Sequence, residues 1–175
     1  MTQHNGMRPQ DIAVLLKIII SPGKWMQKDI AAALFLSAAE VNNSLQRSKL
    51  AELIDKTGRK VMRRTLLEFI QYGLPHVFPA IRGSAAKGLP TAYSAPIMSK
   101  FFIRDQSDNL VWADPKGTVK GESISPLYPN IIKAALHDPE LYELLILVDV
   151  MRVGKVREKE VAMKLLKEKF DQHHA

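Results

Sequence analysis

Residues 27–47, from Gln27 to Arg47, read QKDIAAALFLSAAEVNNSLQR, and this stretch decides the fold. Its apolar residues recur with helical spacing, and the phase of the pattern breaks once, between Phe35 and Ser37. The apolar and small positions on the two sides of this break are Ile30, Ala31, Leu34, Leu36, Val41 and Leu45. The pattern predicts two short helices joined by a tight turn.

The second of these helices has a clear start signal. Ser37 and Glu40 have the Ser-x-x-Glu spacing of a capping box, in which the hydroxyl accepts from the Glu40 amide and the carboxylate reaches back. Such a cap contributes about 1 kcal/mol, which is enough to fix where the helix begins. A helical wheel then places four small or apolar residues on one buried arc: Ala38, Val41, Leu45 and Ser48.

The opposite arc of this helix carries side chains suited to meeting DNA bases. Small, amide and guanidinium groups on an exposed helix face can enter a major groove and contact base edges. The residues that we expect to read bases are Ala39, Asn42, Asn43, Gln46 and Arg47.

The two helices resemble the helix-turn-helix of bacterial winged-helix transcription regulators of the broad MarR-like kind, over about Arg8 to Tyr72. The apolar positions quoted above match those that lock the two helices together in that family, and Ser37 matches its recognition-helix cap. Phe35 departs from the pattern, because the family turn usually has Gly there, and Met26 replaces a usual Ser or Thr cap. The alternative is an ordinary helical hairpin without a role in DNA binding.

The segment after the second helix has the order expected of a small wing. Leu50–Ile54 is a candidate strand, Gly58 marks a turn, and Val61 and Met62 form the returning strand. Lys56 to Arg64 include five cations within nine residues, which suits contacts with DNA phosphates, although a solvated basic turn is the alternative. The full set of expected phosphate contacts is Lys28, Lys49, Lys56, Arg59, Lys60, Arg63 and Arg64.

The remaining segments have patterns typical of helices, which we expect to support this motif. Pro9 begins a supporting helix through Ile20, and Trp25 is placed to staple the motif to the core, with stacking on RNA as the alternative. We expect Gly73 to end a helix that contains Leu66 to Ile70. Helical patterns return after Asp138, and an amphipathic helix over Lys155–Phe170 offers an apolar stripe that can dock on its own domain or on a second subunit. The resemblance favours the second subunit, because winged-helix regulators commonly dimerise through terminal helices.

We therefore expect a mainly α fold with a small β component, in three regions. Residues 8–73 form the winged helix-turn-helix domain, and residues 127–171 form a C-terminal helical region for dimerisation or partner binding. Residues 74–126 form a Pro/Gly-rich ordered extension, with β-favouring runs at Lys100–Ile103 and Asn109–Trp112.

Charge and composition limit the function classes. The chain has 175 residues, no cysteine and a net charge of +7. Residues 1–73 carry 11 Lys and Arg against 6 Asp and Glu, whereas residues 126–175 carry 8 against 8. This concentration of positive charge on the motif favours a polyanion partner. Met1–Asn5 lack the basic start of a signal peptide and Ile12–Ile20 is too short to span a bilayer, so we expect a cytoplasmic protein.

The sequence contains no phosphate-binding glycine loop, no His-Glu-x-x-His and no spaced metal cluster, so we expect neither catalysis nor a metal or cofactor. Our interpretation is a homodimeric regulator, most simply a repressor, that binds duplex DNA. Two alternatives stay open. One is an antitoxin-like protein that neutralises a partner enzyme and represses its own operon, and the other is an enzyme built around residues 74–125.

Overall fold

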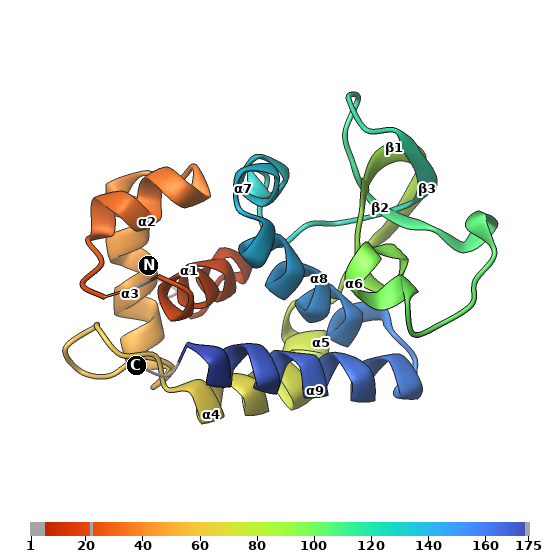
Figure 1. Cartoon of the computed structure of the whole chain (residues 1–175). Helices are drawn as coiled ribbons and strands as arrows, with labels where there is room; N and C mark the ends of the chain where they lie inside the picture. Colours follow the sequence, from red (N-terminus) through yellow and green to blue (C-terminus); the bar gives the residue numbers. More distant parts are fainter. Residues whose placement is uncertain (1–5, 22, 174–175) are drawn as a thin grey trace.

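Helices make up most of the computed structural model, at 57% of the chain, and a small mixed sheet of three strands completes it (Figure 1). The expected mainly α class with a small β component is confirmed. The structure describes residues 6–21 and 23–173, so the expectation for Met1–Asn5 lies outside it. No helix within these residues has both the length and the apolar character needed to cross a membrane.

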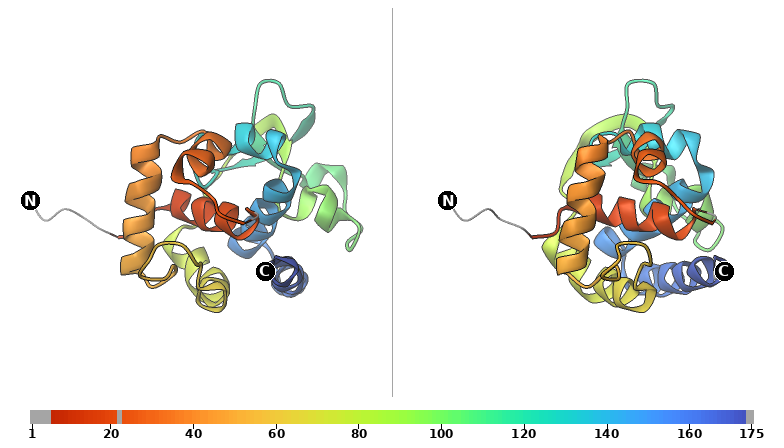
Figure 2. Two further views of the ribbon diagram at one scale, coloured as in Figure 1. Left: turned by 60° about the vertical axis from the view of Figure 1, so that its left-hand side comes forward. Right: turned by 90° about the vertical axis from the view of Figure 1, so that its left-hand side faces the viewer.

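Three helices form the N-terminal part, at the predicted places. They are α1 (Pro9–Ile19), α2 (Gln27–Leu34) and α3 (Ala38–Leu50). Because nearly every residue of α1 from Asp11 onward is buried, this helix lies in the middle of the molecule and supports the other two. α3 lies along one outer edge, far from the sheet (Figures 1 and 2).

The helix after the basic segment runs longer than expected. α4 (Arg63–Glu68) continues without interruption through the π-helical turn η1 (Phe69–Gly73) into α5 (Leu74–Val77). The prediction that Gly73 ends the helix is therefore wrong. A Cβ atom at Gly73 would lie 2.7 Å from the Cδ2 atom of Phe69, so close packing of the Phe69 ring explains the glycine.

The Pro/Gly-rich extension contains the whole sheet. Its strands are β1 (Arg82–Pro90), β2 (Leu110–Ala113) and β3 (Val119–Ile124), with η2 (Ala92–Ser94), α6 (Pro96–Ser99) and η3 (Gln106–Asp108) between the first two. β1 pairs antiparallel with both other strands, which pair parallel with each other. The predicted strand at Asn109–Trp112 is confirmed as β2, whereas Lys100–Ile103 is a turn after α6 in which Phe101 and Ile103 are exposed.

A buried carboxylate joins this sheet to the helices. Asp149 on α8 (Pro139–Val153) accepts hydrogen bonds from Thr91 Oγ1 at 2.7 Å and from Trp112 Nε1 at 2.7 Å. Arg152 Nη1 donates to the same carboxylate at 2.8 Å and also to the Ser125 carbonyl at 3.0 Å. Burial raises the pKa of Asp149, and the neighbouring Arg152 opposes that shift. The extension is thus fixed to α8 by polar contacts as well as by apolar packing.

The C-terminal helices are α7 (Ile131–His137), α8 and α9 (Val156–Gln172). The apolar stripe of α9 is buried within its own chain, where α9 packs on α8 and α4: its buried residues include Ala162, Met163, Leu166 and Phe170. The stripe therefore docks on its own domain, which was one of the two expected alternatives, and the preference for a dimer interface is corrected. Buried residues from all three predicted regions belong to one hydrophobic core.

The C-terminus of α3 shows backbone strain that a mutation can test. The Leu53 amide donates to the Ser48 carbonyl at 3.0 Å, which places Glu52 at the left-handed position of a Schellman motif. Glu52 has φ of 56°, and its side chain is exposed. Glycine adopts this conformation without the steric cost that a Cβ atom brings.

We expect Glu52→Gly to stabilise the protein by about 1 kcal/mol, which corresponds to a rise of about 2–4 °C in the melting temperature. The matched control is Ala51→Gly, one residue earlier and with φ of −81°, which should destabilise by roughly 0.5 kcal/mol. Thermal unfolding of the two variants decides the matter. A loss of stability in Glu52→Gly equal to that of the control would refute the strain at this position.

Candidate nucleic-acid interface

α3 begins where predicted, and one of the two hydrogen bonds of the expected capping box is present. Ser37 Oγ accepts from the Glu40 amide at 3.0 Å, so the cap is confirmed. The Glu40 carboxylate does not reach back to Ser37 and accepts instead from Gln10 Nε2 and from Arg47 Nη2. Glu40 therefore connects α3 to α1 rather than closing the capping box.

The turn between α2 and α3 contains a left-handed phenylalanine. Phe35 has φ of 54° and ψ of 40°, the left-handed conformation that glycine favours. Contacts from α7 and from the segment before it offset the steric cost of this left-handed conformation. Asn130 Nδ2 donates to the Phe35 carbonyl at 2.9 Å, the Tyr128 hydroxyl donates to the Leu34 carbonyl at 3.0 Å, and the Phe35 ring lies 5.4 Å from that of His137.

The outer face of α3 carries exposed amide side chains. Asn42, Asn43 and Gln46 are exposed, as is Ala39 nearer the start of the helix. Within the described part of the chain, none of the three amides has an intramolecular hydrogen-bond partner. The buried face differs slightly from the prediction, because Ala38 is exposed and Ser44 is buried with Val41, Leu45 and Ser48. The three amides proposed to read bases therefore lie on one exposed face of α3.

Arg47 does not belong to that surface, which corrects its assignment to base reading. Its Nε and Nη2 atoms donate to the two carboxylate oxygens of Asp11 at 2.8 and 2.7 Å, and Nη2 also donates to Glu40 at 2.6 Å. The side chain is only 9% exposed, and Asp11 is fully buried. The hydrogen bond to Asp11 is the largest cause of a raised pKa of Arg47. No local spacing in the sequence links Arg47 to Asp11, which lies 36 residues earlier in the first turn of α1.

The predicted wing is reduced to a tight turn with one bridge. Instead of two strands, Ile54 and Val61 form a single antiparallel pair, which corrects the prediction of strands in this segment. Asp55 organises the turn between them, since its carboxylate accepts from the Lys60 and Arg59 amides at 3.0 and 2.8 Å. Thr57 Oγ1 donates to the same carboxylate. Gly58 has φ of 72°, and Lys49 of α3 lies against it.

Some of the predicted phosphate-binding cations are free to meet solvent, and others are held by contacts within the chain. Lys28, Lys56, Lys60 and Arg64 are exposed, and Lys49 is half-buried beside the turn. Arg59 is exposed too, but its guanidinium lies 4.9 Å from the Trp25 ring centroid and donates to the Trp25 carbonyl. Arg63 donates to the carbonyls of Phe170 and His173, so its assignment to DNA phosphates is corrected: it holds the end of α9.

Trp25 serves as a structural residue at this edge. It is 8% exposed and belongs to the hydrophobic core, in agreement with the staple interpretation, and the burial leaves little ring surface for stacking on RNA. Among residues 6–21 and 23–173, no group of three or more His, Asp or Glu side chains is arranged to hold a metal ion. A search of family models, curated proteins and solved structures gave no match to this chain.

The buried pair yields a prediction about stability. Arg47→Ala leaves the Asp11 carboxylate buried without its main partner and should destabilise the protein by about 3–5 kcal/mol. The matched double variant Asp11→Leu/Arg47→Met removes both charges and should recover most of that loss. Urea unfolding monitored by circular dichroism measures both. If Arg47→Ala has wild-type stability, the guanidinium is not part of this pair.

The turn yields a prediction about pH. Hydrogen bonds from the Lys60 amide and then from Thr57 lower the pKa of Asp55 to about 2, from an ordinary value of 3.8. Because the folded-state pKa is the lower one, the stabilisation by Asp55 is complete above about pH 4 and is lost as pH falls towards 2. Carboxyl-carbon NMR should show this midpoint, and Asp55→Asn should abolish the pH dependence of the Arg59 and Lys60 amide signals. A midpoint near 4 in the folded protein would contradict the contact.

Proposed function

We propose that this protein is a winged helix-turn-helix regulator that binds duplex DNA and represses transcription by occluding a promoter. In this proposal α2 and α3 form the helix-turn-helix and the turn at Gly58 is a reduced wing. The proposal assigns the protein no catalytic role and no cofactor. The observation that carries it is the outer face of α3, where three exposed amide side chains lie together and have no hydrogen-bond partner among residues 6–21 and 23–173.

The dimensions and chemistry of α3 suit a major groove. Its 13 residues give a helix about 20 Å long, and a groove about 12 Å wide admits one α-helix. Amide side chains of Asn and Gln pair with adenine through two hydrogen bonds, and the Ala39 methyl suits contact with a thymine methyl. The residues proposed to read bases are therefore Ala39, Asn42, Asn43 and Gln46, without Arg47.

Cations on both sides of α3 suit contacts with the DNA backbone. Lys28 is exposed near the start of α2, while Lys56, Lys60 and Arg64 are exposed in and after the turn. Contacts of this kind fix the position of a protein on DNA without reading its sequence. The charge excess of residues 1–73 supports the same assignment.

We propose further that the protein acts in the cytoplasm as a homodimer, since paired recognition helices would meet successive major grooves about 34 Å apart. The buried stripe of α9 gives this part of the proposal no support, so the dimer requires another face. Light scattering tests it directly: a mass of one chain at working concentration would remove the dimer and leave binding to a single half-site.

A second candidate function is the antitoxin-like interaction protein. Exposed apolar side chains at Tyr72, Val77 and Ile81, around the end of α5, favour it because large apolar residues on a surface often mark contacts with a partner. Co-expression with the product of the neighbouring gene tests it. A stable complex that inhibits an enzyme would favour this function over a regulator that acts alone.

The two kinds of proposed DNA contact predict different effects of mutation. Asn43→Ala and Gln46→Ala should each cost about 1–3 kcal/mol on a preferred duplex and much less on a scrambled one. Lys60→Ala and Arg64→Ala should weaken binding to both duplexes by similar factors, and each should reduce the slope of log affinity against log salt by about 0.9. The preferred duplex comes from selection out of a random pool, and titration at several salt concentrations measures the rest.

Two results would overturn the proposal. If Asn43→Ala and Gln46→Ala lose no discrimination between the duplexes, α3 does not read bases. If the wild-type protein enriches no duplex and binds neither one, the protein is not a sequence-specific DNA-binding regulator, and the interaction protein becomes the better explanation.

A further inference from the structure

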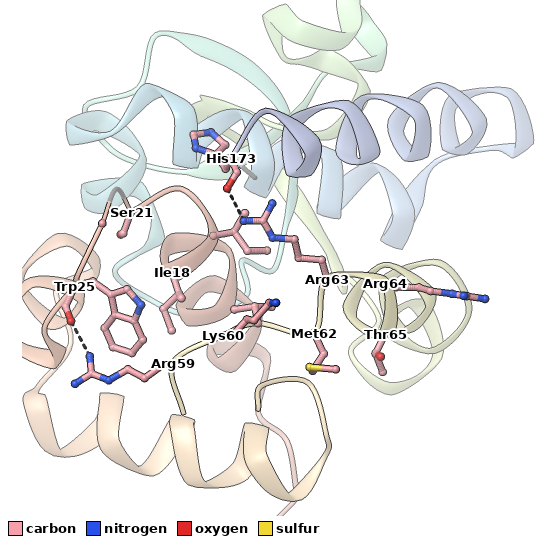
Figure 3. Close-up of a pocket in the computed structure, with 13 residues that line it drawn as sticks. Ile18, Ser21, Trp25, Arg59, Lys60, Met62, Arg63, Arg64, Thr65 and His173 are labelled. Atoms are coloured by element: carbon pink, nitrogen blue, oxygen red, sulfur yellow. Dashed lines mark hydrogen bonds between the residues drawn. The ribbon is translucent and has the colours of Figure 1, made fainter. Parts of the chain in front are cut away.

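A hollow beside the turn at Gly58 has no role in the proposed DNA binding. It has a volume of about 540 Å³ and lies where the end of α1, the Trp25 segment, the turn, the start of α4 and the end of α9 meet (Figure 3). This volume falls within the range of small-molecule sites, about 300–1,000 Å³. The hollow is therefore large enough for a ligand of moderate size.

The lining of the hollow combines positive charge with an apolar wall. Four of its residues are cations, Arg59, Lys60, Arg63 and Arg64, and none of its thirteen described lining residues is acidic. The apolar wall comes from Ile18, Ile19, Trp25, Val61 and Met62. A ligand that matches both features has an anionic group joined to an apolar or planar body.

Two of the guanidinium groups are held in place before any ligand arrives. Arg59 is fixed over Trp25, whose carbonyl accepts from its Nη1 atom at 2.8 Å, and Arg63 is fixed by the His173 carbonyl at 2.7 Å. In Figure 3 the Arg59 guanidinium lies beside Trp25 at one edge of the hollow, Lys60 lies on the side of Arg63, and Arg64 points away. Groups that are already ordered lose little conformational entropy when they bind an anion.

We propose that this hollow binds a small phosphorylated ligand with a planar or apolar body, of the nucleotide class. The phosphates lie on Lys60 and on the remaining N–H groups of Arg63, and the body lies against Ile18, on the side of Trp25 and Arg59. Phosphate suits the site better than a single carboxylate, because it carries more charge and accepts several charge-assisted hydrogen bonds at once.

The site has a regulatory consequence, which rests on the proposed function. Lys60 belongs both to the hollow and to the proposed phosphate contacts with DNA. A phosphate group bound in the hollow would pair with the Lys60 ammonium, which could then no longer contact DNA, and it would add negative charge beside the DNA backbone. Ligand and duplex therefore compete, and the ligand releases the protein from DNA.

Calorimetry on the full chain tests the ligand site directly, with ATP, pyrophosphate and adenosine as probes. ATP should bind with a dissociation constant below about 1 mM, pyrophosphate should bind more weakly, and adenosine should not bind. Lys60→Gln should weaken ATP binding about tenfold. The matched control is Lys56→Gln, which removes a cation of the same turn that does not line the hollow and should leave ATP binding unchanged.

NMR places the ligand independently of affinity. The chain has two tryptophans, of which Trp25 lines the hollow and Trp112 is fully buried beside Asp149. ATP should shift the indole N–H signal of Trp25 and not that of Trp112. Equal losses of ATP affinity in Lys60→Gln and Lys56→Gln, or no shift at Trp25, would overturn the site and indicate attraction by net charge alone.

A competition titration separates this inference from the proposed function. ATP should raise the dissociation constant of the preferred duplex for the wild type and for Lys56→Gln. ATP binding in a protein that binds no duplex would support the site and refute DNA regulation. Duplex binding in a protein that binds neither ATP nor pyrophosphate would refute the site alone. Binding of both without competition would refute the regulatory consequence.

Discussion

A buried carboxylate on the central helix determines how the exposed helix lies. Asp11 accepts from the Arg8 amide at 2.7 Å and from two nitrogens of Arg47, so one side chain both begins α1 and fixes α3. In a medium of low dielectric constant this charge is tolerated only with its partners in place. Together with the burial of Val41 and Leu45, the pair holds α3 in the orientation that leaves its amides in solvent.

A second buried aspartate, Asp149 on α8, has the same role where the sheet meets the helices. Asp149 accepts from Trp112 in the sheet, from Thr91 just after β1 and from Arg152 on α8. In the same way Asp11 accepts from the amide that precedes α1 and from a side chain on α3. Hydrophobic burial supplies most of the stabilisation but has no direction, whereas these hydrogen bonds require one arrangement. Asp11 therefore fixes how α3 lies against α1, and Asp149 fixes how the sheet lies against α8.

The elements with strong periodicity could be predicted from the sequence, and long-range polar contacts could not. The helices around Ile30 and Val41 and the cap at Ser37 followed from local spacing. Arg47 was misassigned because a helix wheel cannot show that Asp11, 36 residues away, lies opposite it. Most of the sheet was missed for the same reason, since β1 and β3 contain few alternating apolar residues and depend on pairing with each other.

The hydrogen bonds from Tyr128 and Asn130 to the turn between α2 and α3 limit how this fold can vary. These side chains come from 94 and 95 residues further along the chain, yet they hold the two carbonyls at which α2 ends. The helix pair is consequently not a transplantable module, because residues 8–73 moved to another scaffold would leave their turn without these donors. The exposed amides of α3 are different: they make no hydrogen bond within the described residues, so they can be substituted while the framework stays the same.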